Sequence, residues 1–393
     1  MKLIQLSVIT ALATSAIMAG GDIAPVEPVV PTVVETPSNT TVSGKLTGYY
    51  ITDDASATYD MFSSDYSQLG FAATLDVSHH FTENITANFS AVGYTNALKK
   101  PNYFYFENDH TGAFMNVANL TATFADTTFI LGRQLLDTPM LGGFDWLLAP
   151  GAFEAYTVAN SSFENITLVG SYVRTWRANN TGDEWIKLTD IGDGNNWTVG
   201  AVYDDKTISG NLWYYNVDAL DYTEIYVDAG YNFTVAKVEA QYVNTNYGAN
   251  SVKDSDAYGI KASGSISNIA LMAAYENVSD NTAGYVGRDT LYTTSWNTFA
   301  ATVLGSSFKA EASGEFSGIS ATMSYAYYEY DQYASMTDDN DGHEFDVILG
   351  YDMKESGINI INAIDMNLVY SNTNWGNNSD DINALELYAN YKF

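Results

Sequence analysis

The chain has 393 residues and a formal net charge of −31, from 16 Lys and Arg against 47 Asp and Glu, and it contains no cysteine. This acidic balance argues against a nucleic-acid partner, because binding phosphate requires a basic surface. The absence of cysteine excludes disulfides, thiolate metal sites and a cysteine nucleophile. Charged residues are only 16% of the chain, while aromatic residues are 14%. That composition favours a membrane β-barrel, although a Tyr-rich soluble sandwich could show similar numbers.

The N-terminal 40 residues predict two segments that precede the folded domain. Residues 1–19 have the positive start, apolar middle and small-residue end of a secretory signal peptide, with cleavage near Ala19. A membrane anchor is the alternative, but the run is short and interrupted by polar residues. Residues 20–40 form a proline-rich stretch, for which we expect an extended periplasmic lead-in. Its prolines are Pro25, Pro28, Pro31 and Pro37.

From residue 41 to residue 393 the sequence alternates between apolar and polar residues with a period of two. Val42, Leu46 and Tyr50, for example, share one face of a strand, and Ser43 and Lys45 share the other. A helical face would repeat every three or four residues. The pattern predicts strands at 41–54, 69–80, 85–95, 114–124, 127–134, 153–160, 165–176, 195–204, 206–217, 222–233, 235–246, 256–266, 268–278, 305–316, 319–330, 342–353, 360–371 and 382–393.

The connections between these strands alternate between short and long. The short ones contain one to four residues, as at Ala125-Asp126 and Ser317-Gly318. The long ones span 55–68, 96–113, 135–152, 177–194, 279–304 and 331–341. Short turns on one side and long loops on the other are typical of outer-membrane barrels, with the turns in the periplasm and the loops outside. The sequence therefore predicts an all-β, antiparallel transmembrane β-barrel of about 18 strands, with 16 as the alternative.

The last strand ends on an aromatic residue. Counting back by twos, Phe393, Tyr391, Leu387 and Leu385 share an apolar face. A C-terminal strand that ends in Phe resembles the signal by which outer-membrane barrels reach their assembly machinery, so Tyr391 and Phe393 are the predicted insertion signal. In a closed barrel this strand pairs with the first one, which leaves no strand edge in the lipid.

A barrel of 16–18 strands encloses a water-filled lumen, so something must narrow or close it. The lead-in is too short to form a plug domain, and an internal loop is the remaining candidate. The connection 135–152 holds Pro139, Pro150 and an apolar cluster that includes Phe144, Trp146 and Leu147. A surface loop has no reason to be so apolar, whereas a loop packed on the inner wall does. A contact between subunits is the alternative reading.

The stretch 131–153 resembles a segment of the OprD family of 18-stranded outer-membrane porins. In that family a Gly-Arg-Gln strand end leads into a loop with Thr-Pro, a central Asp and a later Pro before Phe. The matching positions are Gly132, Arg133, Gln134, Thr138, Pro139, Asp145, Pro150 and Phe153. The rest of the chain resembles the porins of epsilon-type proteobacteria. The resemblance implies that the loop folds into the lumen and narrows the pore.

From this resemblance and the positions at strand tops, we expect two groups of site residues. The predicted pore constriction consists of Arg133, Gln134, Asp145 and Arg177. The predicted structural residues of the loop are Pro139, Pro150, Trp146 and Phe153. Strict alternation, however, places Arg133 on the face of Phe129 and Leu131, which would point to lipid.

The expected ion selectivity departs from the family. Members that take carboxylates are thought to guide them along a ladder of lumenal arginines, but this chain has only four arginines and twelve lysines. The shortage of cations argues against anion selectivity. The acidic excess predicts a weak preference for cations.

The sequence offers weak metal candidates and no catalytic ones. Its four histidines form no two-histidine ligand spacing, and no Ser/His/Asp arrangement is readable, so we predict that the protein is not an enzyme. Asp338, Asp339 and Asp341 cluster hard oxygen ligands near a glycine, the chemistry that suits Ca²⁺, but they do not complete an EF-hand loop. Hydrated acidic loops are the alternative, and no other cofactor is predicted.

Taken together, these features predict a porin in the outer membrane of a Gram-negative bacterium. It would pass ions and small hydrophilic solutes, sit among bilayer lipid and lipopolysaccharide, and assemble as a homotrimer. The alternative is a structural or adhesive surface barrel, in which the long loops 279–304 and 331–341 would carry the binding. A third class, an outer-membrane hydrolase, is disfavoured by the size of the barrel.

Overall fold

A computed structural model describes most of the chain. The described residues are 39–56, 58–98, 111–145, 147–179, 186–187, 195–248, 253–330, 340–356, 363–376 and 380–393. The predicted signal peptide and residues 20–38 of the lead-in lie outside these ranges. No helix among the described residues is long and apolar enough to cross a membrane.

Eighteen strands form one continuous wall in the described part of the chain. They are β1 (Thr40–Asp53), β2 (Gln68–His80), β3 (Ile85–Asn96), β4 (Thr111–Phe124), β5 (Thr127–Gln134), β8 (Ala152–Phe163), β9 (Ile166–Arg177), β11 (Asn196–Asp204), β12 (Ile208–Val217), β13 (Tyr222–Asn232), β14 (Ala236–Tyr247), β15 (Ser255–Ile266), β16 (Ile269–Ser279), β17 (Gly305–Phe316), β18 (Ile319–Tyr330), β19 (Asn340–Asp352), β20 (Ile364–Asn374) and β21 (Ile382–Lys392).

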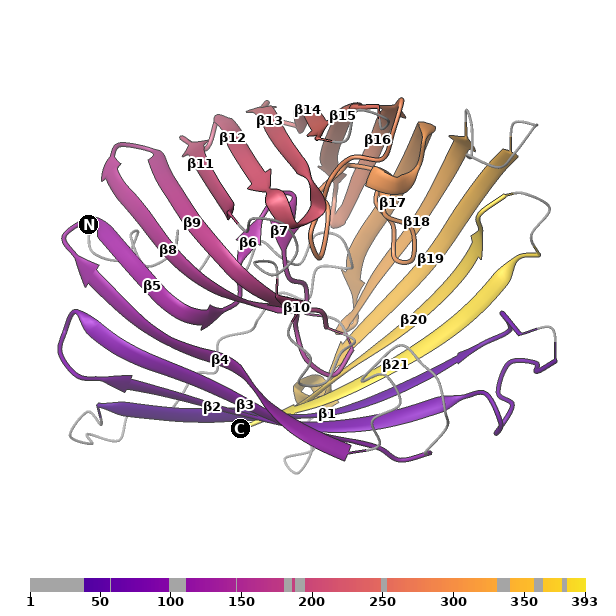
Figure 1. Ribbon diagram of the computed structural model, residues 1–393. Helices are drawn as coiled ribbons and strands as arrows, with labels where there is room; N and C mark the ends of the chain where they lie inside the picture. Colours follow the sequence, from indigo (N-terminus) through magenta and orange to yellow (C-terminus); the bar gives the residue numbers. More distant parts are fainter. Residues whose placement is uncertain are drawn as a thin grey trace.

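Shorter elements lie in the connections. Among the described residues these are β6 (Asp137–Thr138), β7 (Leu141–Gly142), β10 (Ile186–Lys187) and the 3-10 turns η2 (Asp218–Leu220), η3 (Ala300–Thr302) and η4 (Met353–Ser356). The pair β6 and β7 forms a small hairpin of its own. In Figure 1 this hairpin lies inside the ring of wall strands.

The wall is a closed antiparallel barrel (Figure 1). Each wall strand pairs with the next one along the chain, and β21 pairs with β1, with Tyr388 opposite Tyr49. At the seam, the backbone N–H of Gly44 donates to the Phe393 carbonyl (2.9 Å), and the N–H of Phe393 donates to the Gly44 carbonyl (3.0 Å). The prediction of about 18 strands and of closure by the last strand is confirmed.

The two faces of the wall follow the predicted alternation. Large apolar side chains that are exposed recur at every second position, for example Leu46 on β1, Phe71 and Leu75 on β2, and Ile260 on β15. They face outward, where a hydrocarbon environment would bury them. The intervening positions face the interior. Many of them are polar or small, and the large ones, such as Tyr49 and Tyr215, are buried there. Tyr391 and Phe393 stack on each other at the outer face, with ring centroids 6.1 Å apart.

The strand boundaries differ from the prediction where turn chemistry intervenes. We predicted a strand from residue 206, but β12 begins at Ile208. Lys206 has a φ of +75°, which is incompatible with a strand. The Asp205 carboxylate accepts hydrogen bonds from the backbone N–H of Thr207 (2.9 Å) and of Ile208 (2.6 Å), which fixes the turn.

Candidate functional site

The lumen is crossed by the connection between β5 and β8, which we call the first inner loop (residues 135–151, of which 146 is not described). Five of its large apolar side chains are buried, as the composition indicated: Leu136, Met140, Leu141, Leu147 and Leu148 are each at most 5% exposed, whereas Leu135 is 43% exposed. Leu147 and Leu148 pack in a cluster with wall residues that include Tyr49 and Tyr388. Burial of this apolar surface against the inner wall holds the loop inside the barrel.

Hydrogen bonds fix both ends of the first inner loop to the wall. The N–H of Met140 donates to the Tyr215 hydroxyl on β12 (3.2 Å). The Pro150 carbonyl accepts from Asn116 Nδ2 on β4 (3.1 Å) and from the Arg177 guanidinium on β9. Between these ends, Asp145 reaches across to Lys45 on β1, with 3.5 Å from Oδ2 to Nζ. The loop therefore contacts the wall on several sides.

The connection between β16 and β17, the second inner loop (residues 280–304), also turns inward. We expected it among the long loops and did not predict its inward fold. The loop is rich in hydroxyl groups, and it also buries apolar residues, such as Val286 and Leu291, in the core of the barrel. Its polar groups find acceptors on the lumenal side of the wall, so hydrogen bonds hold it in addition to apolar burial.

Buried wall glutamates supply these acceptors. Glu276 on β16 accepts from the N–H of Tyr292 (3.1 Å). Glu344 on β19 accepts from the N–H of Asn297 (2.6 Å) and the Thr298 hydroxyl (2.6 Å). Glu386 on β21 accepts from the indole N–H of Trp296 (2.6 Å). The three carboxylates come from separate strands, so the loop is fixed to the wall along the arc from β16 to β21.

A buried carboxylate also organises the second inner loop internally. Asp289 has no exposed surface. It accepts from the Thr294 hydroxyl (2.5 Å) and the N–H of Ala301 (2.7 Å), which draws the loop back on itself. Burial raises the pKa of Asp289 to about 6, because a low-dielectric surrounding disfavours the charged form.

The two inner loops are joined where they meet. The N–H of Val286 donates to the Met140 carbonyl (2.9 Å), and the N–H of Gly142 donates to the Val286 carbonyl (3.0 Å). Arg288 and Asp137 form an ion pair whose two side chains are both only 5% exposed. The joined loops form one bar across the lumen.

Aromatic side chains extend this junction. The rings of Phe144 in the first loop and Phe299 in the second lie 6.2 Å apart, and Tyr285 stacks on Phe299 at 5.4 Å. Such pairs stabilise contacts beyond the area that they bury. The bar thus combines an ion pair, backbone hydrogen bonds and ring contacts.

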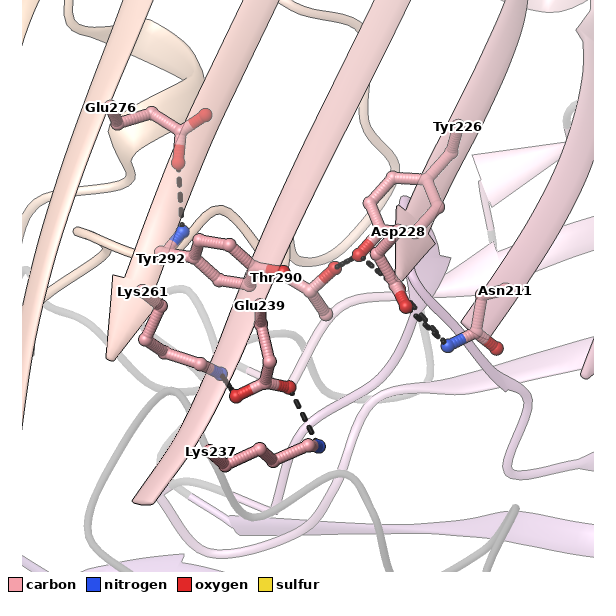
Figure 2. A network of polar contacts seen from close by, with 9 residues as sticks. All are labelled: Asn211, Tyr226, Asp228, Lys237, Glu239, Lys261, Glu276, Thr290 and Tyr292. Atoms are coloured by element: carbon pink, nitrogen blue, oxygen red, sulfur yellow. Dashed lines mark hydrogen bonds and ion pairs between the residues drawn. The ribbon is translucent and has the colours of Figure 1, made fainter. Parts of the chain in front are cut away.

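A network of charged side chains lies on the wall beside the second inner loop (Figure 2). Glu239 on β14 accepts from Lys237 (2.8 Å) and from Lys261 on β15 (3.1 Å). The Lys261 ammonium lies 4.4 Å from the centroid of the Tyr292 ring. Nearby on β13, both oxygens of Asp228 accept from Asn211 Nδ2 (3.1 and 3.0 Å).

Other lysines on the inner wall are also paired with acids. Lys45 contacts Asp145, as described above. Lys309 on β17 lies 3.6 Å from Glu311, and Lys392 on β21 lies 2.8 Å from Asp365. The described inner wall therefore presents its ammonium groups next to carboxylates rather than as a ladder of unmatched positive charges.

The four residues that we predicted at the constriction occupy different environments. Asp145 is in the inner loop, and its side chain is 57% exposed. Gln134 is buried and donates to the Ala155 carbonyl (2.9 Å). Arg177 is fully buried, donates to Asn116 and lies 4.2 Å from the Phe114 ring, so it supports the first inner loop rather than lining open lumen.

Arg133 does not share the lumenal face. It lies opposite Glu154 in β8 and on the same side of β5 as the exposed residues Phe129 and Leu131. Its guanidinium donates to the Met115 carbonyl (3.1 Å). The strict alternation of residues predicted this outward direction of the Arg133 side chain. The resemblance to the porin loop, in contrast, led us to place Arg133 among the constriction residues. The structure therefore corrects that placement.

The predicted structural residues of the first loop are placed as follows. Phe153 is fully buried at the start of β8, and the Pro150 carbonyl is the acceptor described above. Pro139 is partly buried between β6 and β7. Trp146 lies outside the described residues, as do Asp338 and Asp339 of the predicted Ca²⁺ cluster. Asp341 pairs with Glu329 in the β18–β19 ladder, and the described residues contain no group of three potential metal ligands.

Sequence reasoning missed the glutamates that hold the second inner loop. Each is a single acidic residue on the polar face of a strand, such as Glu386 between Leu385 and Leu387. That position predicts an inward direction but gives no partner. Their partners in the second inner loop lie 16 to 90 positions away, as Tyr292 does from Glu276 and Trp296 from Glu386, and nothing local in the sequence indicates these contacts.

A closed 18-stranded wall with an apolar outer face and loops folded into its lumen defines a class of protein, the wide outer-membrane barrel. Within this class, the chain has the fold of the Occ/OprD outer-membrane channels of Pseudomonas and Acinetobacter, which it matches over about 90% of its length. No family model and no curated protein sequence matches the chain.

Three solved structures illustrate the match. OpdO of Pseudomonas aeruginosa superposes with a TM-score of 0.76 at 15% identity, over 90% of this chain and 97% of OpdO. OccAB4 of Acinetobacter baumannii gives 0.75 at 14% identity, over 91% and 99%. Pseudomonas aeruginosa OccK2 (OpdF), solved in complex with glucuronate, gives 0.76 at 13% identity, over 90% and 98%. At these identities the likeness establishes the fold.

Proposed function

We propose that the protein is an outer-membrane channel through which ions and small hydrophilic solutes diffuse down their gradients. The observation that carries the proposal is a closed 18-stranded barrel whose lumen is narrowed by two joined loops, with partly exposed charged groups beside them. A wall of this size encloses more space than side chains alone fill. The path for solutes runs past the inner loops.

The glucuronate held by OccK2 indicates the scale of solute that such a barrel can admit. We place the protein in the outer membrane of a Gram-negative bacterium, delivered there by the signal peptide and the C-terminal strand, in contact with bilayer lipid and lipopolysaccharide. We expect a homotrimer. The net charge of −31 and the exposed Asp145 support a weak preference for cations among small ions.

The adhesin alternative is less well supported than the channel. In that reading the connections 279–304 and 331–341 would carry the binding from the outside. Residues of the first connection instead contact the lumenal glutamates Glu276, Glu344 and Glu386, where a large external partner has no access. Residues 331–339 lie outside the described part of the chain.

Single-channel recording of the purified protein in a planar bilayer under a salt gradient tests the proposal. We expect stepwise openings, a reversal potential slightly on the cation side, and steps in groups of three from a trimer. A variant that replaces residues 283–301 with a short glycine-serine linker should conduct more, since it removes one half of the bar. A well-folded barrel without openings would overturn the channel assignment, and single ungrouped steps would overturn the trimer.

A further inference from the structure

Glu239 occupies a central position in the charged network of the inner wall. It lies opposite Lys261 in the β14–β15 ladder, and Lys237 precedes it by two residues on the same face of β14. One carboxylate therefore meets two ammonium groups, at 2.8 and 3.1 Å. The side chains of Lys237, Glu239 and Lys261 are 35%, 17% and 23% exposed. These three residues, the wall triad, are paired with each other and still accessible from the lumen.

The triad lies at the level of the second inner loop. Tyr292 of that loop places its ring against the Lys261 ammonium, 4.4 Å from centroid to Nζ. The Tyr292 backbone is in turn held by Glu276 on the next strand. Figure 2 shows the loop residues Thr290 and Tyr292 directly beside the triad. A solute that passes the loop on this side of the lumen therefore meets the triad.

The charges in this part of the wall are balanced. Two ammonium groups, at Lys237 and Lys261, are accompanied by the carboxylates of Glu239 and Asp228. Glu239 contacts both lysines, so neither ammonium faces the lumen without an adjacent carboxylate. Without Glu239 the same place would carry two adjacent positive charges, and a narrow, partly desolvated lumen would strengthen their attraction for anions.

We propose that Glu239 determines the solute selectivity of the channel by masking Lys237 and Lys261, so that solutes without net charge, zwitterions in particular, pass in preference to monovalent anions of the same size. This inference rests on the proposed channel function. A monoanion that contacts either lysine must compete with the Glu239 carboxylate, which lies 2.8 and 3.1 Å from the two ammonium groups and repels it. A zwitterion can offer its own ammonium to Glu239 while its carboxylate contacts a lysine, so the exchange leaves no charge unmatched.

The pairing of Lys45 with Asp145, of Lys309 with Glu311 and of Lys392 with Asp365 extends the same arrangement along the described wall. The triad differs from these pairs because one acid serves two lysines. Loss of a single side chain therefore exposes two positive charges there and only one elsewhere. This makes Glu239 the position where a neutral substitution has the greatest effect on selectivity.

The test compares E239Q with E83Q, which removes the same charge from an exposed residue in a turn between β2 and β3. Two quantities are measured: the reversal potential in a KCl gradient, and the entry of alanine and of lactate into proteoliposomes. We expect E239Q to move the reversal potential toward that of chloride and to raise the ratio of lactate to alanine entry roughly threefold or more. E83Q should match the wild type in both.

A second variant separates charge from altered structure. In K237Q/E239Q/K261Q all three charges are removed together, so the ratio of lactate to alanine entry should return to the wild-type value. If E239Q behaves like E83Q, or if the triple variant keeps the altered ratio, the proposal is overturned. These outcomes require a conducting wild-type channel, whereas failure of the channel assignment would show as no conductance in any variant.

Discussion

The two inner loops reach the same place by different chemistry. The first is apolar, and Leu147 and Leu148 pack against the wall beside Tyr49 and Tyr388. The second also buries apolar residues such as Val286 and Leu291, but wall carboxylates such as Glu344 and Glu386 accept hydrogen bonds from it. Apolar contacts depend on shape and area, whereas hydrogen bonds to buried carboxylates depend on individual atoms. A loop can therefore be fixed in a lumen by hydrogen bonds to single wall carboxylates as well as by apolar packing.

The difference also affects what each loop leaves accessible. The first loop carries an exposed acid, Asp145, toward the β1 side of the lumen, where Lys45 meets it. The second brings Tyr292 to the β14–β15 side, next to Lys261. Each loop thus places a side chain beside a lysine of the wall, Asp145 at Lys45 and Tyr292 at Lys261, although only the first loop was predicted to fold inward.

The largest expected effect comes from breaking the junction between the loops. R288A removes one partner of a buried ion pair and leaves the Asp137 carboxylate uncompensated. We expect this to lower the free energy of unfolding by about 3–5 kcal/mol. We expect the loops to separate, with larger and noisier single-channel conductance and a lower apparent unfolding temperature in detergent.

The double variant R288M/D137L is the matched control for this change. It replaces the ion pair by apolar side chains, which is often neutral or stabilising. It should therefore restore the unfolding temperature of R288A. Wild-type conductance in R288A would contradict the assignment of the pair as the joint between the loops.

A pair of smaller changes compares the loops directly. L148A should lower the free energy of unfolding by about 3 kcal/mol, because Leu148 is fully buried. E386A should lower it by about 2 kcal/mol, because the Trp296 indole and two tyrosine hydroxyls lose this acceptor.

The chain has no cysteine, so in the variant S295C the introduced thiol is the only one, and its reactivity reports how accessible the second inner loop is. We expect E386A, but not L148A, to speed the reaction of Cys introduced at position 295 with a water-soluble thiol reagent. Equal rates in both backgrounds would mean that the two loops move as one body.

The smallest expected effect is a dependence of folding stability on pH through Asp289 in the second inner loop. The pKa of Asp289 is about 6 in the folded protein, above the value of 3.8 for the free group, so the folded state binds this proton more tightly than the unfolded state does. Its contribution therefore favours the folded state as pH falls, and is lost as pH rises through 6. When the pH falls from 7 to 5, we expect this group to raise the free energy of unfolding by about 1 kcal/mol.

The measurement is the apparent unfolding temperature of wild type and D289N over that range. The wild type should gain stability relative to D289N as pH falls from 7 to 5. A constant difference between the two would show that Asp289 does not titrate in this range.

The wall was predictable because its signal is local and repeated. A period of two, read over ten residues, gives each strand and its outward face, and turns such as Ala125-Asp126 and Ser317-Gly318 separate the strands. Errors occurred at ends where turn geometry overrides alternation, as at Lys206 with its φ of +75°. The direction of Arg133 followed from the same periodicity, and the resemblance to a known loop misled us about its role.

The lumen was predictable only where its sequence is unusual. The apolar cluster at Phe144, Leu147 and Leu148 indicated a buried loop, whereas the Ser- and Thr-rich second loop resembles any hydrated loop. The pairing of Glu239 with Lys261 depends on the register between β14 and β15. The pattern within either strand alone does not give that register. Contacts across the lumen, such as that from Trp296 to Glu386, carry no local signal.

The seam between β1 and β21 has the same ladder of hydrogen bonds as any hairpin of the wall, but it joins residues some 337 positions apart, as Tyr49 and Glu386 are. Closing a chain segment of that length costs roughly 5 kcal/mol in conformational entropy, against about 1 kcal/mol for a turn of a few residues. Even the space at the seam is limited, since a side chain at Gly44 would collide with the Phe393 ring and the Thr74 carbonyl. We therefore expect the barrel to open first at this seam. We expect G44V to favour that opening, which would leave a sheet with two free edges.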